Sequence, residues 1–177
     1  VPFEWLYRAP WVQYRAASME GKEYPKRKRL RVEGFDYAAP GFAYAVTLCS
    51  HPGAPSLADE EPARAIASVL RQWSARGLAR VHCYCVMPDH VHLVMSIGRS
   101  GAGLPSLVRR LKTWVSRCLR QRGIPPPIWQ RSYYEHVVRH DEDLERVCEY
   151  ALGNPVRRGL VETPEEWPYS GMLDPPA

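Results

Sequence analysis

The chain has 177 residues, which is enough for one domain with a substantial core and too few for two comfortable ones. Hydrophobic residues make up 45% of it, and the formal net charge of +5 is a mild indication of a polyanionic partner. Its five cysteines include no Cys-x-x-Cys pair, which argues against a zinc ribbon or a disulfide framework and favours reduced thiols in the cytosol. No apolar run reaches the roughly 20 residues that span a bilayer, so we expect neither a signal peptide nor a membrane partner.

Basic and acidic residues are unevenly distributed along the chain. Residues 1–40 are rich in Pro, Arg and aromatics without a clear period, and we predict an irregular basic N-terminal extension there. Its basic run over residues 22–31 is interpreted either as a DNA-contacting arm or as a solvated leader. Residues 41–173 are predicted to form one domain, whose middle (104–140) is basic and whose last third is acidic.

The periodicity of apolar residues predicts four strands and three helices. Aromatic and β-branched runs indicate the strands, and apolar residues at helical spacing indicate the helices. The tight Pro88-Asp89 connection favours an antiparallel hairpin between the second and third strands. We therefore expect an α+β fold, in which helices pack against an antiparallel sheet. The strands are predicted at 42–49, 80–87, 91–97 and 133–139, and the helices at 60–76, 104–122 and 141–152.

The helix predicted at 104–122 has the clearest apolar stripe in the sequence, and basic residues fill the rest of its surface. Gly123 and the Pro125-Pro126-Pro127 run are predicted to end this helix, and the part from 157 to 172 is predicted to be irregular. No Gly-rich phosphate loop is present, so the sequence gives no support to nucleoside-triphosphate chemistry. The predicted stripe consists of Leu104, Leu107, Val108, Leu111, Trp114, Val115, Cys118 and Leu119.

A His-x-His pair opens the third predicted strand. Alternate residues of a strand point to the same face, so His90 and His92 project together while Val91 points into the core. Two neutral imidazoles at that separation can share one divalent ion, although such pairs also occur often by chance. The position of the pair at a strand edge, directly after the Pro88-Asp89 turn, favours the metal-binding interpretation.

A tyrosine and an asparagine at the end of the last predicted helix complete a candidate set. Two histidines leave a metal under-coordinated, and Asn154 is the candidate third ligand because its side-chain oxygen suits Mg²⁺ or Mn²⁺. It follows Tyr150 by four residues, and an i, i+4 pair shares one helix face. Such a set is suited to phosphoryl transfer with Tyr150 as the nucleophile. The other interpretations are that Tyr150 packs at the core edge and that Asn154 caps the helix.

Several motifs in order carry a resemblance to a known family. Together they resemble the REP-associated tyrosine transposases, a branch of the single-tyrosine HUH transposases, over about residues 42–172. Two features depart from the family pattern. The adjacent Tyr133 and Tyr134 are rival candidates for the nucleophile, and the N-terminal segment does not match the family closely. The matching segments are Val86–Val94, Trp129–Tyr134, Glu149–Tyr150, Asn154–Val161 and Trp167–Ser170.

The resemblance implies a fold, an activity and a site. It implies a ferredoxin-like antiparallel sheet with helices packed on one face, the HUH endonuclease fold. It implies cleavage of single-stranded DNA beside REP-like hairpins, with Mg²⁺ or Mn²⁺ and a 5′-phosphotyrosine intermediate, in a bacterial, nucleoid-associated protein. On that resemblance His90 and His92 match the metal-binding pair, Tyr150 the nucleophile and Asn154 the third ligand. A monomer and a homodimer are both compatible with it.

Basic side chains are the candidates for DNA contact, because phosphate contacts provide most sequence-independent affinity. Aromatics such as Trp129, Tyr133, Tyr134 and Trp167 are either base-stacking platforms or ordinary packing residues. Two further functions compete with strand transfer: a non-catalytic hairpin-binding module, and a metal-dependent phosphoesterase that uses water in place of Tyr150. The candidate DNA-binding residues are Arg109, Arg110, Lys112, Arg117, Arg120, Arg131, Arg157 and Arg158.

Overall fold

The computed structural model describes residues 41–98, 102–138 and 144–176, so the predicted extension at 1–40 lies outside the described residues. All four predicted strands and all three predicted helices form within a few residues of the expected bounds. The segment 157–172, predicted to be irregular, contains the short helix η2 and a fifth strand, and the short helix α5 ends at its first residue. The elements are β1 (Ala43–Cys49), α2 (Glu60–Ala75), β2 (Ala79–Val86), β3 (His90–Ile97), α3 (Leu104–Gln121), β4 (Tyr134–Val138), α4 (Leu144–Leu152), α5 (Asn154–Arg157), η2 (Pro164–Glu166) and β5 (Ser170–Met172).

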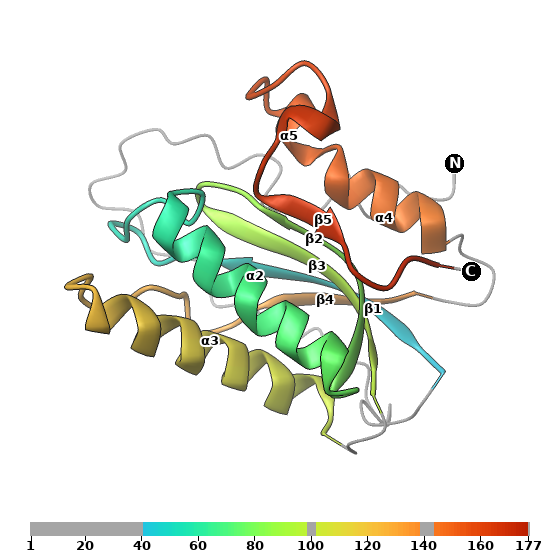
Figure 1. The fold of residues 1–177 in the computed structure, drawn as a ribbon, viewed down its shortest axis with the longest axis horizontal. Helices are drawn as coiled ribbons and strands as arrows, with labels where there is room; N and C mark the ends of the chain where they lie inside the picture. Colours follow the sequence, from blue (N-terminus) through green and yellow to red (C-terminus); the bar gives the residue numbers. More distant parts are fainter. Residues whose placement is uncertain (1–40, 99–101, 139–143, 177) are drawn as a thin grey trace. The chain divides into compact units, whose positions relative to one another are not determined.

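The strands form one antiparallel sheet in the order β4-β1-β3-β2-β5 (Figure 1). The first six main elements follow the β-α-β-β-α-β sequence of a ferredoxin-like fold. The β2–β3 connection is the tight hairpin that Pro88-Asp89 predicted, and Met87 N–H donates to the His90 carbonyl across it at 2.8 Å. The predicted α+β class with an antiparallel sheet is therefore confirmed.

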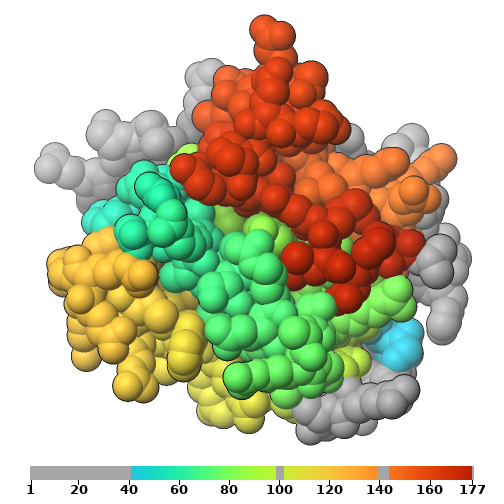
Figure 2. All heavy atoms as spheres, viewed as in Figure 1, coloured from blue at the N-terminus to red at the C-terminus, as the bar shows by residue number. Residues whose placement is uncertain are grey.

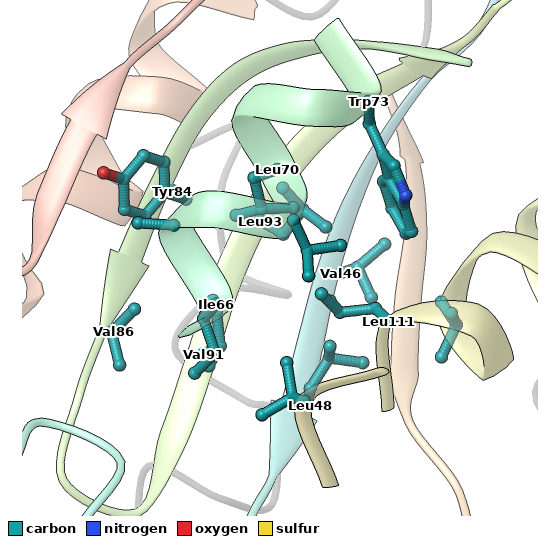
Figure 3. Packing of buried hydrophobic residues seen from close by; sticks show 14 of the residues in the cluster. Val46, Leu48, Ile66, Leu70, Trp73, Tyr84, Val86, Val91, Leu93 and Leu111 are labelled. Atoms are coloured by element: carbon teal, nitrogen blue, oxygen red, sulfur yellow. The ribbon is translucent and has the colours of Figure 1, made fainter. Parts of the chain in front are cut away.

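One face of the sheet carries the main core beneath α2 and α3. Leu48 of β1 and Leu93 of β3 point to this face and are buried. Ile66 of α2, against Val91, and Leu111 of α3 point toward the side chains of this face, as Figure 3 shows. Truncating one such leucine to alanine costs about 2–5 kcal/mol through lost burial and the cavity left behind.

The opposite face of the sheet is crossed by α4, which packs against β2 and β3. Its buried Val147, Cys148 and Ala151 face the strands, and the Cys83 thiol of β2 donates to the Cys148 carbonyl at 3.8 Å. The helices α2 and α3 thus share one face, as the resemblance implies, while α4 covers part of the other. His90 and His92 lie on this α4 side, because they alternate with the core-facing Val91 and Leu93.

The stripe predicted for α3 is correct except at one position. Its six other aliphatic members are buried, and Cys118 is half-buried, but Trp114 is 47% exposed. At 100° per residue Trp114 lies at the margin of the stripe, well away from Leu104 and Val115 at its centre. The prediction that Trp114 belongs to the core is therefore wrong.

No helix in the described ranges combines the length and the hydropathy that crossing a bilayer requires.

Candidate active site

The two histidines converge on one point from the start of β3. Both side chains are buried, with 5% of His90 and 8% of His92 exposed. Their rings meet edge to face with centroids 4.6 Å apart, and the two Nε2 atoms are separated by 3.0 Å. The strand alternation that predicted a shared face therefore brings the same nitrogen of each ring together.

The other ring nitrogen of each histidine is held by an oxygen atom. His90 Nδ1 lies 2.6 Å from Oδ1 of Asp89, the residue before it in the turn. His92 Nδ1 lies 3.1 Å from Oγ1 of Thr47, which is directly opposite it on β1. Partners of this kind fix the orientation of a metal-binding imidazole. Sequence reasoning missed Thr47 altogether and assigned Asp89 only to the turn.

The local electrostatics keep His92 neutral and Asp89 ionised. Burial lowers the pKa of His92 well below its usual range, and the nearby His90, Arg157 and Arg158 lower it further. The hydrogen bond from His90 holds the pKa of Asp89 below its ordinary value, against the opposing effect of burial. A neutral imidazole, as in His92, is the protonation state in which histidine binds metal.

The histidine pair fits a divalent cation. When Asp89 and Thr47 accept the Nδ1 protons, both Nε2 lone pairs point at one position, and a cation satisfies both. Two nitrogen ligands at right angles about 2.1 Å from one ion lie about 3.0 Å apart, which matches the observed separation. Within the described residues no third His, Cys, Asp or Glu joins the pair. Among the residues that the structure describes, a third protein ligand is therefore of another type.

Asn154 lies buried at the start of α5, directly after α4 ends. Its Nδ2 donates to the carbonyls of Tyr150 at 3.2 Å and Ala151 at 3.0 Å. The amide nitrogen therefore caps α4, which is the structural role that the sequence left open. Because these bonds use only Nδ2, Oδ1 is the atom that can serve a cation.

Tyr150 is half-buried in the last turn of α4 and is covered by an arginine. The Arg157 guanidinium lies 3.8 Å from the centroid of the Tyr150 ring and also donates to the Tyr150 carbonyl. The same charge acts on His92 and on Cys85, so this guanidinium lies on the histidine side of the sheet. Arg158 influences both His92 and Asp89. The C-terminal end of α4 and the segment after it thus provide two positive charges near the histidine pair.

The rival tyrosines point to opposite faces of the sheet. Tyr134 pairs with Thr47 across β4 and β1, and residues opposite each other share a face, so it lies on the side of His92. Tyr133 faces α3, with Lys112 Nζ 5.9 Å from its ring centroid. Of the two, Tyr134 is the serious rival to Tyr150.

The candidate DNA-binding residues divide between the two sides of the sheet. Arg157 and Arg158 are exposed near the histidines, and Arg131 is exposed just before β4. The four arginines of α3 are exposed on the helix that covers the other face. The ammonium of Lys112 donates to the carbonyls of Gln130 and Ser132, so in this structure it links α3 to the segment before β4. The exposed arginines of α3 are Arg109, Arg110, Arg117 and Arg120.

Two of the aromatics considered for base stacking have structural roles. Trp129 is buried in the main core, and Trp167 Nε1 donates to the Val86 carbonyl at 2.9 Å. The indole of Trp167 therefore ties the C-terminal segment to β2.

Two curated proteins are similar to about half of this chain. A Haemophilus influenzae protein assigned as a REP-associated tyrosine transposase is 36% identical over 98 residues, 50% of this chain and 56% of its own length. The REP-associated tyrosine transposase of Escherichia coli K12 is 26% identical over 90 residues, 51% of this chain and 52% of its own. The chain therefore spans about half the length of the curated relatives that it matches.

A solved structure and a family model extend the comparison. The structure of a REP-associated tyrosine transposase bound to a REP hairpin superposes with a TM-score of 0.64 at 20% identity, covering 79% of this chain and 82% of that one. It confirms the fold. The family model described as "Transposase IS200 like" matches residues 43–152, a range that includes both histidines and Tyr150. The resemblance is thereby confirmed, and the chain belongs to the family of IS200-like transposases.

Proposed function

We propose that this chain is a metal-dependent single-stranded-DNA endonuclease and strand transferase that acts at hairpins of palindromic, REP-like repeats. One observation carries the proposal: the two Nε2 atoms of His90 and His92 lie 3.0 Å apart while both Nδ1 atoms are held from behind. Membership of a transposase family supports DNA as the substrate. The relative whose structure superposes on this chain is bound to a REP hairpin, and this supports a hairpin as the form of the DNA substrate.

Three side chains are proposed to hold the metal. His90 and His92 supply Nε2, and Asn154 supplies Oδ1, a mixed nitrogen and oxygen set that suits Mg²⁺ or Mn²⁺. When bound, the ion polarises a phosphate oxygen and stabilises the charge that develops on the leaving oxygen. Asp89 and Thr47 orient the two rings, and their hydrogen bonds keep the Nδ1 protons away from the metal side.

Tyr150 is proposed to cleave the strand by direct attack. Its hydroxyl oxygen forms a bond to phosphorus as the bond from phosphorus to the 3′ oxygen breaks, and the 5′ end of the strand remains on Tyr150 as a phosphotyrosine. The phenol proton leaves to solvent water, and the departing 3′ oxygen takes up a proton. The Arg157 guanidinium, which stacks on the Tyr150 ring, holds the phenol in place and brings positive charge toward the phosphate.

Strand transfer is the same step in reverse with a different 3′ hydroxyl. That hydroxyl attacks the phosphotyrosine, a new phosphodiester forms, and Tyr150 is released with its proton. One phosphodiester is exchanged for another, so no nucleoside triphosphate is needed, in agreement with a sequence that has no Gly-rich phosphate loop. The protein is proposed to act in the cytoplasm at the nucleoid, as a monomer or a homodimer.

Covalent trapping tests this proposal. The full chain is incubated with a labelled library of single-stranded hairpins and Mn²⁺ and run under denaturing conditions, beside Tyr150→Phe and the matched control Tyr134→Phe. We expect a metal-dependent adduct in the wild type and in Tyr134→Phe, and none in Tyr150→Phe. An adduct that is lost only in Tyr134→Phe makes Tyr134 the nucleophile. Hairpin binding in a native gel with no adduct favours the alternative, a non-catalytic hairpin-binding module.

A further inference from the structure

Trp114 is the one aromatic side chain in the described ranges that is exposed to solvent. It lies in α3 with 47% of its surface exposed, although the helix has buried positions next to it. With 47% of its surface in water, Trp114 gives up about half of the burial energy that a Trp side chain offers a fold. Its exposure is therefore costly to the monomer and suggests a ligand.

The neighbours of Trp114 on the helix surface are basic. Arg110 precedes it by four residues and Arg117 follows it by three, so both lie beside the indole on the same side of α3. Both arginines are exposed, and α3 contains no acidic residue. An aromatic ring between two guanidinium groups is the combination that binds bases and phosphates of single strands.

The adjacent helix does not neutralise this charge. The ion pair of Arg122, just after α3, with Glu61 at the start of α2 shows that the two helices run antiparallel. Glu61 is therefore paired with Arg122, and Glu60 is paired with Arg64 of its own helix, so neither carboxylate is paired with Arg110 or Arg117. In the part of the chain that the structure describes, no ion pair is recorded for Arg110 or Arg117. Figure 2 shows α2 and α3 side by side at the surface facing the viewer.

This surface is separate from the candidate active site. The buried side of α3 packs through Leu111 and Val115 onto the sheet face that carries the main core. His90, His92 and α4 lie on the other face. DNA held at Trp114 is therefore not held by the residues assigned to cleavage.

We propose that Trp114, Arg110 and Arg117 form a second contact site for single-stranded DNA, in which the indole stacks on an unpaired base and the arginines bind the flanking phosphates. The inference rests on the proposed function in taking DNA as the ligand. Charge argues against a second copy as the occupant, because two such arginine-rich faces repel each other. A paired base in a duplex does not offer its face to an indole, so the site selects unpaired nucleotides.

Fluorescence anisotropy on the full chain tests the site. Each variant is combined with Tyr150→Phe to prevent covalent capture, and is titrated against a labelled unpaired oligonucleotide and a blunt duplex of equal length. Trp114→Ala is expected to weaken binding of the unpaired strand by about tenfold, with a much smaller effect on the duplex. Trp114→Phe keeps a stacking ring and is expected to retain most of the affinity. Met172→Ala is the matched control, since Met172 is 45% exposed on the edge strand β5.

Two results would overturn the proposal. One is an affinity of Trp114→Ala for the unpaired strand equal to that of Met172→Ala. The other is a wild-type dimer, seen by sedimentation, that Trp114→Ala converts to a monomer, because the indole is then a protein contact. The covalent trapping assay on the wild-type chain, which retains Tyr150, reports separately on cleavage. If the wild type forms no adduct but its binding of the unpaired strand still depends on Trp114, the proposed reaction is refuted and the proposed second site is not.

Discussion

Replacing Thr47 with Val removes one hydroxyl from beneath His92 and keeps the β-branched shape that suits β1. Thr47 is 6% exposed, and its Oγ1 lies 3.1 Å from His92 Nδ1, so water does not readily take its place. Without that oxygen His92 favours the tautomer that carries its proton on Nε2, where it can donate to His90 Nε2 3.0 Å away. For His92 to bind a metal through Nε2, the proton then has to move from Nε2 back to Nδ1. Losing such a supporting partner typically lowers metal affinity by about 10–100-fold.

Calorimetric titration of the full chain with Mn²⁺ at pH 7.5 measures this effect. Thr47→Ser retains the hydroxyl and serves as the control, with an expected affinity close to that of the wild type. Urea unfolding of each variant checks the fold, since an unsatisfied Nδ1 costs about 1–3 kcal/mol of stability. The reasoning fails if Thr47→Val binds Mn²⁺ as tightly as the wild type, or if Thr47→Ser loses as much affinity as Thr47→Val.

Three further predictions concern stability. Burial lowers the pKa of His82, so the unfolded chain takes up a proton there below about pH 6.5 that the folded chain does not. His82 alone should therefore lower stability on acidification by at most about 1.4 kcal/mol per pH unit, in addition to the slope from His92, whose pKa burial also lowers. Urea unfolding between pH 7.5 and 5.5 measures this slope, which His82→Gln should flatten; equal slopes would contradict the assignment. Lys112→Met should lower the free energy of unfolding by about 1–2 kcal/mol through its lost carbonyl partners, without weakening DNA binding. Leu111→Ala should lower it by about 2–5 kcal/mol in the same urea assay, and a cost below 1 kcal/mol would contradict its place in the core.

Local periodicity was sufficient to predict most of the fold. Ile66, Leu70 and Trp73 recur at helical spacing, and all three are buried in α2. The fifth strand, β5, was missed because three residues are too short to show a period and its pairing with β2 is specified by the partner strand. The tail that carries it is fixed by single contacts such as that of the Trp167 indole with Val86.

The sequence of a helix does not by itself determine on which side of the sheet the helix packs. The arginines of α3 were predicted to serve DNA, and nothing local indicated that they lie across the sheet from His90 and His92. Trp114 was assigned to the core because it continues an apolar stripe, yet at its margin of the stripe 47% of its surface is exposed, while Leu119 at the other margin is buried. Both outcomes depend on tertiary packing.

The candidate site was predictable where it depends on strand alternation. That rule placed His90 and His92 on one face, and the structure brings their Nε2 atoms together. Thr47 escaped detection because it precedes His92 by 45 residues and meets it only through the β1–β3 register. Arg157 was expected only as a DNA contact, because its stacking on Tyr150 depends on how α5 follows α4. The roles of Tyr150 and Asn154 stay predictions that the trapping experiment addresses.

The two halves of the candidate site stand on elements that should open at very different rates. β3 is the middle strand, hydrogen-bonded on both sides, and amides in such a strand usually exchange with solvent only on global unfolding. The helix α4 has nine residues and three buried side chains, so we expect its amides to exchange through local opening with a low free-energy cost. Hydrogen–deuterium exchange would then show strong protection of the amides around His90 and His92, and weak protection of the amides of α4, the helix that carries Tyr150. A DNA end attached to Tyr150 would be carried along with the helix, while the histidines stay in place.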